Sequence, residues 1–124
     1  MWLDKYEISK WAYFYCKDKE DKPKIRKYIT DSYWAYYYCQ YIKDRLEVRK
    51  FITDSIYAYH YCKFVKDRPE VRKYIIESFW AYWYCREMKD RSEVRKNITK
   101  SQDAFNYCHN IKNRPGVRKY IGVT

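Results

Sequence analysis

Residues 53–75 read Thr-Asp-Ser-Ile-Tyr-Ala-Tyr-His-Tyr-Cys-Lys-Phe-Val-Lys-Asp-Arg-Pro-Glu-Val-Arg-Lys-Tyr-Ile, and the pattern of this segment recurs along the chain. Shifting the segment by 23 residues in either direction places Ala on Ala, Tyr on Tyr and Cys on Cys without a gap. The chain therefore consists of five tandem units, which are residues 7–29, 30–52, 53–75, 76–98 and 99–121. Repetition at a fixed period of this length is typical of a repeat architecture.

The fixed residues of each unit follow a helical spacing. The sixth, ninth and tenth positions are Ala, Tyr and Cys in every unit, and the thirteenth is mostly Ile, Val or Met. These offsets place the four side chains on one face of an α-helix. The third position is always Ser, which favours a helix N-cap. We expect a first helix, helix A, from about the fourth to the fourteenth position, with the Ser as its N-cap.

A second and shorter helix, helix B, is expected after the Lys-Asp-Arg segment. Proline is tolerated in the first turn of a helix, so Pro23, Pro69 and Pro115 mark its start. We expect about two turns, with residues such as Val71 and Ile75 on the buried side. One such hairpin cannot bury its own apolar face, so neighbouring units must stack.

The predicted fold class is all-α, an α-solenoid of five helix-turn-helix repeats that forms a single domain over residues 1–124. Residues 1–6 are expected to form an N-terminal cap, with Trp2 and Leu3 over the open end, and residues 122–124 a tail. The aromatic run at residues 33–39 has high β propensity and would also suit a β-solenoid. The helical spacing and the presence of only two Gly residues favour helices.

The charge of the chain favours an acidic partner. Its 27 Lys and Arg residues exceed its 16 Asp and Glu residues, so the formal net charge is +11. Such an excess suits nucleic acid or the acidic face of a protein. No apolar run approaches the roughly 18 residues of a membrane span, and the N-terminus does not resemble a secretory signal. We expect a cytoplasmic protein without membrane partners.

The consensus Ser-x-x-Ala-Tyr-x-Tyr-Cys-x-x-Ile-Lys-Asp-Arg-Pro-Glu-Val-Arg-Lys-Tyr-Ile covers residues 7–121 and resembles a class of Tyr-rich short helical repeats in phage-encoded proteins. Members of that class carry Ala-Tyr-x-Tyr-Ala, then Ile-Lys-Gly-Arg and a Pro-Glu segment. Here Cys replaces the second Ala and Asp replaces the Gly. The resemblance implies a helical repeat and a viral origin, and it implies no settled activity.

The repeated residues give no indication of an enzyme or a metal centre. The five cysteines share one core-facing position, which is typical of small buried side chains in a reducing compartment. No Cys-x-x-Cys cluster is present, so we expect no metal and no cofactor. A catalytic site needs one unique arrangement, whereas the polar residues here recur in most units. We expect a non-enzymatic protein.

Three cations recur in each unit and predict a basic stripe along the helix B side. They are a Lys or Arg before helix B (Lys22, Arg45, Arg68, Arg91, Arg114) and an Arg-Lys pair near the end of the unit (Arg26, Lys27, Arg49, Lys50, Arg72, Lys73, Arg95, Lys96, Arg118, Lys119). Such a stripe can follow a phosphate backbone. The alternative is a structural role, in which acidic residues of the turn neutralise the cations. The spacing also predicts ion pairs between Glu47, Glu70 or Glu93 and the lysine three residues later.

The positions at which the units differ predict the ligand-binding surface. The fourth, eighth, eleventh and twelfth positions vary between units and lie on one stripe of helix A, away from the Ala and Cys face. A constant core with a variable outer row is how solenoids build binding surfaces. The predicted ligand-binding stripe comprises Phe14, Tyr33, Tyr37, Tyr41, His60, Phe64, Phe79, Trp83 and Arg86. The alternative is that several of these residues pack against the adjacent helix A.

Two functions remain open from the sequence, with a component of a virion or of its assembly as a third and plainer alternative. In the first, the protein is a protein-interaction module, a phage or mobile-element factor that sequesters a host protein with an acidic face. In the second, it binds nucleic acid through the basic stripe, with aromatic side chains stacked on exposed bases. We rank protein binding first.

Overall fold

The computed structural model describes residues 3–123, and in that range all regular structure is α-helical. The longer helices are α1 (Lys5–Asp18), α3 (Ser32–Tyr41), α5 (Ser55–Phe64), α7 (Ser78–Glu87) and α9 (Ser101–Asn110). The shorter helices are α2 (Pro23–Arg26), α4 (Leu46–Arg49), α6 (Pro69–Arg72), α8 (Ser92–Arg95) and α10 (Pro115–Arg118). The predicted all-α repeat fold is confirmed. None of the described helices combines the length and the apolar character that crossing a bilayer requires.

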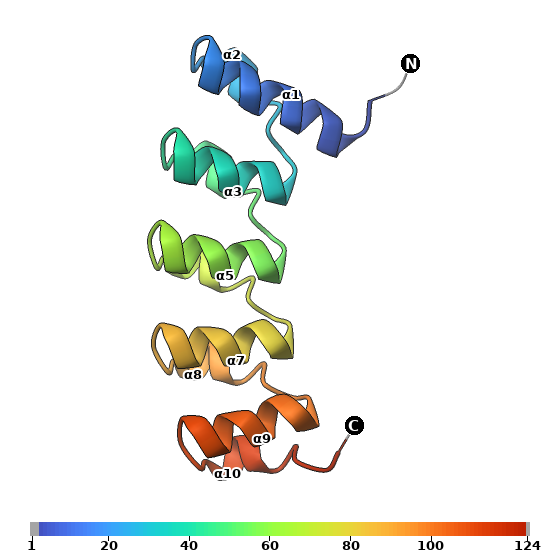
Figure 1. Ribbon diagram of the computed structural model, residues 1–124, viewed down its shortest axis with the longest axis vertical. Helices are drawn as coiled ribbons and strands as arrows, with labels where there is room; N and C mark the ends of the chain where they lie inside the picture. The colour runs from blue at the N-terminus through green and yellow to red at the C-terminus, as the bar shows by residue number, and fades with distance from the viewer. Residues whose placement is uncertain (1–2, 124) are drawn as a thin grey trace.

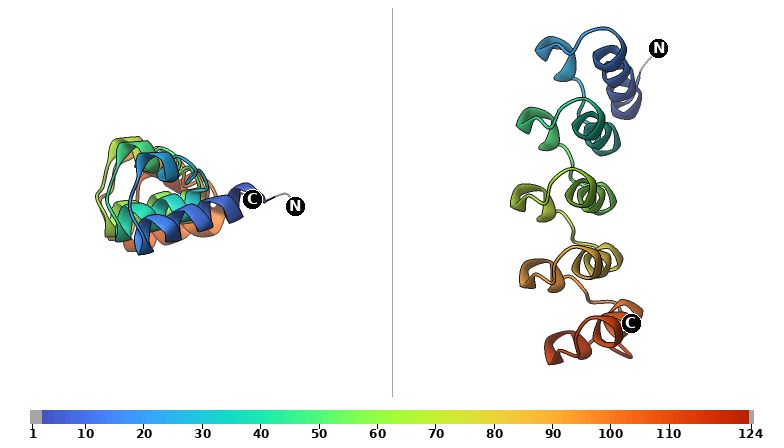
Figure 2. Two further views of the ribbon diagram at one scale, coloured as in Figure 1. Left: turned by 90° about the horizontal axis from the view of Figure 1, so that it is seen from above. Right: turned by 60° about the vertical axis from the view of Figure 1, so that its left-hand side comes forward.

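The helices form a stack of paired elements. Each long helix packs against the long helix of the next unit and against the short helix of its own unit. The long helices thereby form one layer and the short helices a second layer, as the right-hand view of Figure 2 shows. The two ends of the chain lie at opposite ends of the stack (Figure 1). Each interior unit therefore has one neighbour on either side.

The core consists of the residues that recur in every unit. In the third unit Ala58, Tyr61 and Cys62 of α5 are buried, and Val71 and Ile75 close the core from the other side. The equivalent residues of the second and fourth units are buried in the same way. The predicted core face is therefore confirmed.

The recurrent serine has a different role from the one that the sequence predicted. The N-cap of α5 is Asp54, and Ser55 is the first helical residue. The Oγ of Ser55 donates a hydrogen bond to the carbonyl of Tyr74 (2.9 Å) and accepts from the backbone N–H groups of Ile76 (3.0 Å) and Glu77 (3.1 Å). The N-cap prediction is therefore wrong. The buried hydroxyl instead satisfies backbone groups where the chain enters the next unit.

Helix B is shorter than predicted, although it begins at the expected proline. In the third unit α6 spans one turn, because the following amides bond to carbonyls only three residues earlier. The N–H of Tyr74 donates to Val71 (3.0 Å) and that of Ile75 donates to Arg72 (2.9 Å). This tighter turn ends the α-helix and brings Ile75 into the core.

The described part of the N-terminal segment leads directly into α1. Asp4 is the N-cap of α1, and its side chain accepts from the N–H of Glu7 (2.8 Å). Leu3 is exposed and Trp2 lies outside the described residues, so the covering role expected of these two residues stays a prediction. The ring of Tyr6, however, lies 5.7 Å from that of Trp34 in the second unit.

Candidate interaction surfaces

The interface between consecutive units contains a network of charged and phenolic side chains. The Tyr61 hydroxyl donates to Asp44 of the preceding unit (2.8 Å) and accepts from Nε of Arg68 (2.8 Å). Arg68 also pairs with Asp44 (3.1 Å), as does Arg49 (3.1 Å). The Nε of Arg49 lies 3.4 Å from the carboxylate of Glu70 in the following unit. Two arginines, two carboxylates and one tyrosine thus connect the two units.

The network recurs in full at two other interfaces and without the glutamate at the last one, and it shifts the pKa values of some of its members. Burial and hydrogen bonding to Asp21 raise the pKa of Tyr38 to about 12. Burial acts to raise the pKa of Asp21, but hydrogen bonds from Arg26 and Tyr38 outweigh it, so that this pKa lies below its usual value. Asp21 is therefore held ionised and Tyr38 neutral inside the stack.

Because of this network, most arginines of the predicted basic stripe form ion pairs that hold the units together. Four of them pair with the carboxylate five residues earlier (Arg26–Asp21, Arg49–Asp44, Arg72–Asp67, Arg95–Asp90). Arg118, in the last unit, is exposed and donates to Asn113 (2.8 Å). The glutamates pair with arginines of the preceding unit (Glu47–Arg26, Glu70–Arg49, Glu93–Arg72). The predicted pairing with the lysine three residues later is wrong, because the arginine of the neighbouring unit lies closer.

The lysines of the stripe are exposed and form a row on the short-helix side, which we call the lysine row (Lys27, Lys50, Lys73, Lys96, Lys119). Four of them lie over the aromatic ring of the next residue (5.3 Å for Lys27 and Tyr28, 5.2 Å for Lys50 and Phe51, 5.2 Å for Lys73 and Tyr74, 5.2 Å for Lys119 and Tyr120). Ammonium groups at this distance are attracted to the ring face. In four units the lysine row therefore places an exposed ammonium group over an aromatic ring.

The predicted ligand-binding stripe lies on the long helices, and its rings connect through aromatic residues of neighbouring units. Trp34 lies 5.6 Å from Phe14 of the first unit and 5.8 Å from Tyr37 of its own. Trp80 likewise lies 5.6 Å from His60 of the preceding unit and 4.9 Å from Phe79. Tyr57 lies 5.3 Å from Tyr33 of the preceding unit. We call the stripe together with these connecting rings the aromatic surface (Phe14, Tyr33, Trp34, Tyr37, Tyr41, Tyr57, His60, Phe64, Phe79, Trp80, Trp83, Arg86).

The residues of the predicted stripe divide into exposed and half-buried ones, whereas the connecting ring of Trp34 is buried. Phe14 (40%), Tyr41 (58%), Phe64 (54%) and Phe79 (50%) expose large apolar side chains, and Arg86 is also exposed. The remaining four residues of the predicted stripe (Tyr33, Tyr37, His60, Trp83) are half-buried. The neighbouring helices therefore cover part of the stripe, as the alternative interpretation of the sequence had it, and leave the other part open.

Cations border the exposed rings. Lys63 lies 5.4 Å from the ring centre of Phe64, and the guanidinium of Arg86 lies 5.2 Å from that of Trp83. Burial, with a smaller contribution from the charge of Lys63, lowers the pKa of His60, which keeps the imidazole neutral near pH 7. The aromatic surface thus combines apolar rings with positive charge at its edge.

Sequence reasoning missed the connecting rings of the fifth position, Trp34, Tyr57 and Trp80. A signal was present, because the fifth position is aromatic in four of the five units (Trp11, Trp34, Tyr57, Trp80) and the seventh is aromatic in all five. Comparing only which positions vary directs attention to the fourth and eighth positions. The nearly constant aromatic residue of the fifth position contributes both to the interface between units and to the aromatic surface.

The N-terminal part of the aromatic surface is hollowed. A cavity of about 330 Å³ is lined by seven residues (Tyr13, Phe14, Lys17, Tyr33, Trp34, Tyr37, Tyr41). The Nε1 of Trp34 is buried, and no described side chain or backbone group accepts a hydrogen bond from it. The cavity therefore has an apolar wall with a lysine at its edge.

The cysteines lie in the core rather than at a reactive site. Burial raises the pKa of Cys39, Cys62 and Cys85 to about 12, so these thiols stay protonated at neutral pH. Cys108, in the fifth unit, is half-buried. Over residues 3–123, no three His, Cys, Asp or Glu side chains gather in the way that metal ligands do.

No protein-family model matches the chain. The chain also matches no curated protein and no solved structure. Its function is therefore inferred from the two surfaces, the aromatic surface and the lysine row.

Proposed function

We propose that this protein is a non-catalytic binding module whose aromatic surface engages an acidic face of a partner protein. The supporting observation is the set of exposed rings on the long-helix layer, which includes Tyr41, Phe64 and Phe79. Exposed aromatic side chains in one contiguous area mark interaction sites. Aromatic residues also supply a large share of the binding free energy at protein interfaces.

The charge around these rings specifies the kind of partner. Lys17, Lys63 and Arg86 lie over rings of the aromatic surface or next to it, so a partner with carboxylates around an apolar centre would be complementary. The arginines of the predicted basic stripe contribute little, because carboxylates of the stack already neutralise them.

The proposal includes the cellular compartment and the origin of the partner. The five thiols are free, which supports a reducing compartment and hence the cytoplasm. The resemblance to phage-type repeats supports a host protein as the partner that is sequestered.

Affinity capture from an extract of the native source tests the proposal. The bait would be the wild-type protein, the double variant Phe64→Ala/Phe79→Ala, and the control Leu46→Ala/Ile76→Ala. The control removes similarly exposed apolar side chains at Leu46 (62%) and Ile76 (62%), which lie outside the aromatic surface. A partner should be retained by the wild type and the control and lost from the double variant, with affinity reduced at least ~10-fold. Equal retention by all three proteins would refute the role of the aromatic surface.

Binding of single-stranded nucleic acid is the second candidate, and the lysine row favours it. Each Lys-aromatic pair could place a cation on a phosphate and a ring against a base. A salt series with labelled single-stranded and double-stranded oligonucleotides tests this candidate. It requires binding that weakens steeply with salt and is lost in Lys50→Gln/Lys73→Gln. If no binding occurs even at low salt, this candidate is excluded.

A further inference from the structure

One position of the last unit interrupts the ion-pair network. In the third and fourth units a glutamate carboxylate lies near two guanidinium groups. Glu93 is 3.1 Å from Nε of Arg72 and 4.0 Å from Nη1 of Arg91. Glu70 has the same relation to Arg49 (3.4 Å) and Arg68 (4.0 Å). The equivalent residue of the last unit is Gly116.

The two arginines are nevertheless present at that last interface. Arg95 pairs with Asp90 through Nη1 (2.8 Å), and Arg114 pairs with the same carboxylate through Nη2 (3.4 Å). Within residues 3–123, no glutamate lies near Arg95 in the way that Glu93 lies near Arg72. A Cβ atom built on Gly116 would meet no atom within 4 Å, so the space of the missing side chain is open.

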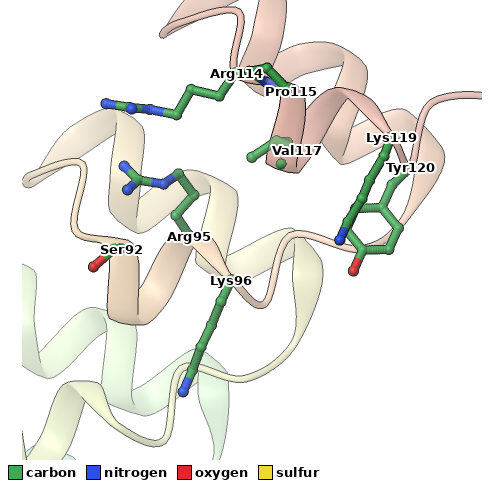
Figure 3. Close-up of a pocket in the computed structure, with 9 residues that line it drawn as sticks. Ser92, Arg95, Lys96, Arg114, Pro115, Val117, Lys119 and Tyr120 are labelled. Carbon is green, nitrogen blue, oxygen red and sulfur yellow. The ribbon is translucent and has the colours of Figure 1, made fainter.

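This space belongs to a cavity of about 450 Å³ whose charged lining is entirely basic (Figure 3). The charged residues are Arg95, Lys96, Arg114 and Lys119, and the ring of Tyr120 also lines the cavity. In Figure 3 the guanidinium groups of Arg95 and Arg114 extend in the same direction. Four cations thus surround a cavity that no carboxylate lines.

The equivalent cavity one unit earlier is an internal control. It measures about 250 Å³ and is lined by the matching residues Arg72, Lys73 and Lys96. It also contains Glu93 and Asn97, where the last unit has Gly116 and Tyr120. The replacement of Glu by Gly accompanies a larger cavity and removes the negative charge from its lining.

We propose that this cavity binds the phosphate group of a small phosphorylated molecule, in the position that a glutamate carboxylate occupies in the preceding units. Guanidinium groups bind phosphate and carboxylate oxygens with the same paired geometry, so two arginines arranged for a carboxylate also suit a phosphate. Lys96 and Lys119 add charge at the edge, and the cavity has room for more than one phosphate group. The site is separate from the aromatic surface and does not depend on the function proposed for it.

Isothermal titration with pyrophosphate tests the site. The wild type should bind about one equivalent, and Gly116→Glu should weaken binding at least ~10-fold, because the new carboxylate would occupy the place of the anion. Lys66→Gln is the matched control. It changes the net charge equally at an exposed lysine outside the cavity, and it should leave the affinity within about twofold. Circular dichroism would establish that each variant is folded.

A variant that should gain a second binding site provides the second part of the test. Glu93→Gly should open an equivalent site one unit earlier, between Arg72 and Arg91, and raise the number of bound pyrophosphates from about one to about two. Comparing adenosine triphosphate with a 5′-phosphorylated oligonucleotide, each against its unphosphorylated counterpart, distinguishes a free metabolite from a nucleic-acid end as the phosphate source. The proposal is overturned if Gly116→Glu binds as tightly as the wild type, or if Lys66→Gln weakens binding to the same degree.

Discussion

The tyrosine of the ninth position shows how single residues hold the stack together. The ring of Tyr61 is fully buried, and its hydroxyl contacts Asp44 of one unit and Arg68 of its own. A buried hydroxyl without a partner is costly, so the carboxylate and the guanidinium are needed where the tyrosine is buried between two units. The frequency of Arg and Asp in the turns therefore follows from the choice of Tyr rather than Leu or Phe for the core.

Buried acids with raised pKa values predict that alkaline pH destabilises the protein. Burial raises the pKa of Cys62 from 9.0 to about 12 and that of Tyr38 from 10.0 to about 12. The folded state then binds more protons than the unfolded state above pH 9, so the free energy of unfolding is fully retained below pH 9 and falls between pH 9 and pH 12. Each such group contributes at most about 1.4 kcal/mol per pH unit. Urea unfolding at pH 8, 10 and 11, followed by circular dichroism, measures this loss.

The double variant Cys62→Ala/Tyr38→Phe separates this effect from general charge repulsion at high pH. It removes one thiol and one phenol that must stay protonated in the fold, so its free energy of unfolding should fall less steeply between pH 9 and pH 11. A wild-type free energy that stays constant from pH 8 to pH 11 would contradict the protonated state assigned to these groups.

At the scale of helices, the sequence predicts the contacts that repeat along one helix and misses the hydrogen bonds and contacts between units. The spacing of Ala58, Tyr61 and Cys62 identifies the buried face of α5, because those contacts repeat along one helix. The role of Ser55 could not be read from spacing, since its partners lie 21 and 22 residues away at Ile76 and Glu77. A serine before a helical pattern fits a cap equally well, and only the position of the next unit decides.

The candidate surfaces also divide into features that one unit determines and features that depend on the neighbouring unit. The variable positions direct attention to the long-helix layer, where Tyr41, Phe64 and Phe79 are exposed. Which rings are covered depends on the register of neighbouring helices, and this cannot be read from one unit. The arginines were ambiguous for the same reason, because Arg49 meets one partner in its own unit and another, Glu70, in the next.

The bridging serine gives a prediction about how helices are connected. Ser55→Ala leaves the backbone N–H groups of Ile76 and Glu77 without their acceptor and the Tyr74 carbonyl without its donor. We expect a loss of about 1–3 kcal/mol in the free energy of unfolding. Ser101→Ala is the matched change in the last unit, where the hydroxyl accepts from the exposed N–H of Gly122 (2.7 Å). It should cost less, because water can replace that bond. Urea titration of both variants checks the order, and an equal loss in both would mean that the bridge adds nothing beyond local packing.

At the scale of the whole molecule, the two end faces of the stack keep the aromatic residues of an interior interface but lack its charged residues. Inside the stack, the seventh residue of one unit packs on the fifth of the next, as Tyr59 packs on Trp80 (5.4 Å). The corresponding end residues, Phe105 (51%) and Trp11 (65%), are both exposed. The charged half is absent, because the first unit has Lys22 and Lys24 at the positions of Arg and Glu.

The last unit is altered in the complementary way, since Asn113 stands where the preceding units have Asp. Both ends are therefore basic and cannot form the Tyr-Asp-Arg network with each other. A second copy brought end to end would gain an apolar contact and meet repulsion between like charges. Terminal repeats with atypical outer faces keep solenoids from extending indefinitely.

Restoring the charged half should convert the protein into a head-to-tail assembly. The variant Lys22→Arg/Lys24→Glu/Asn113→Asp supplies the arginine, the glutamate and the aspartate that the first three interior interfaces use, and Trp11 and Phe105 already supply the rings. In sedimentation velocity the wild type should keep one sedimentation coefficient as its concentration rises. The weight-average mass of the variant should increase with concentration, because a head-to-tail contact leaves a free end for the next copy. Adding Trp11→Ala to the variant should reverse the association, since that side chain is largely exposed in the single molecule, where among the described residues its ring stacks only on Tyr15 of the same helix. Association that persists without Trp11, or a wild type that assembles equally well, would show that these charges do not determine where the stack ends.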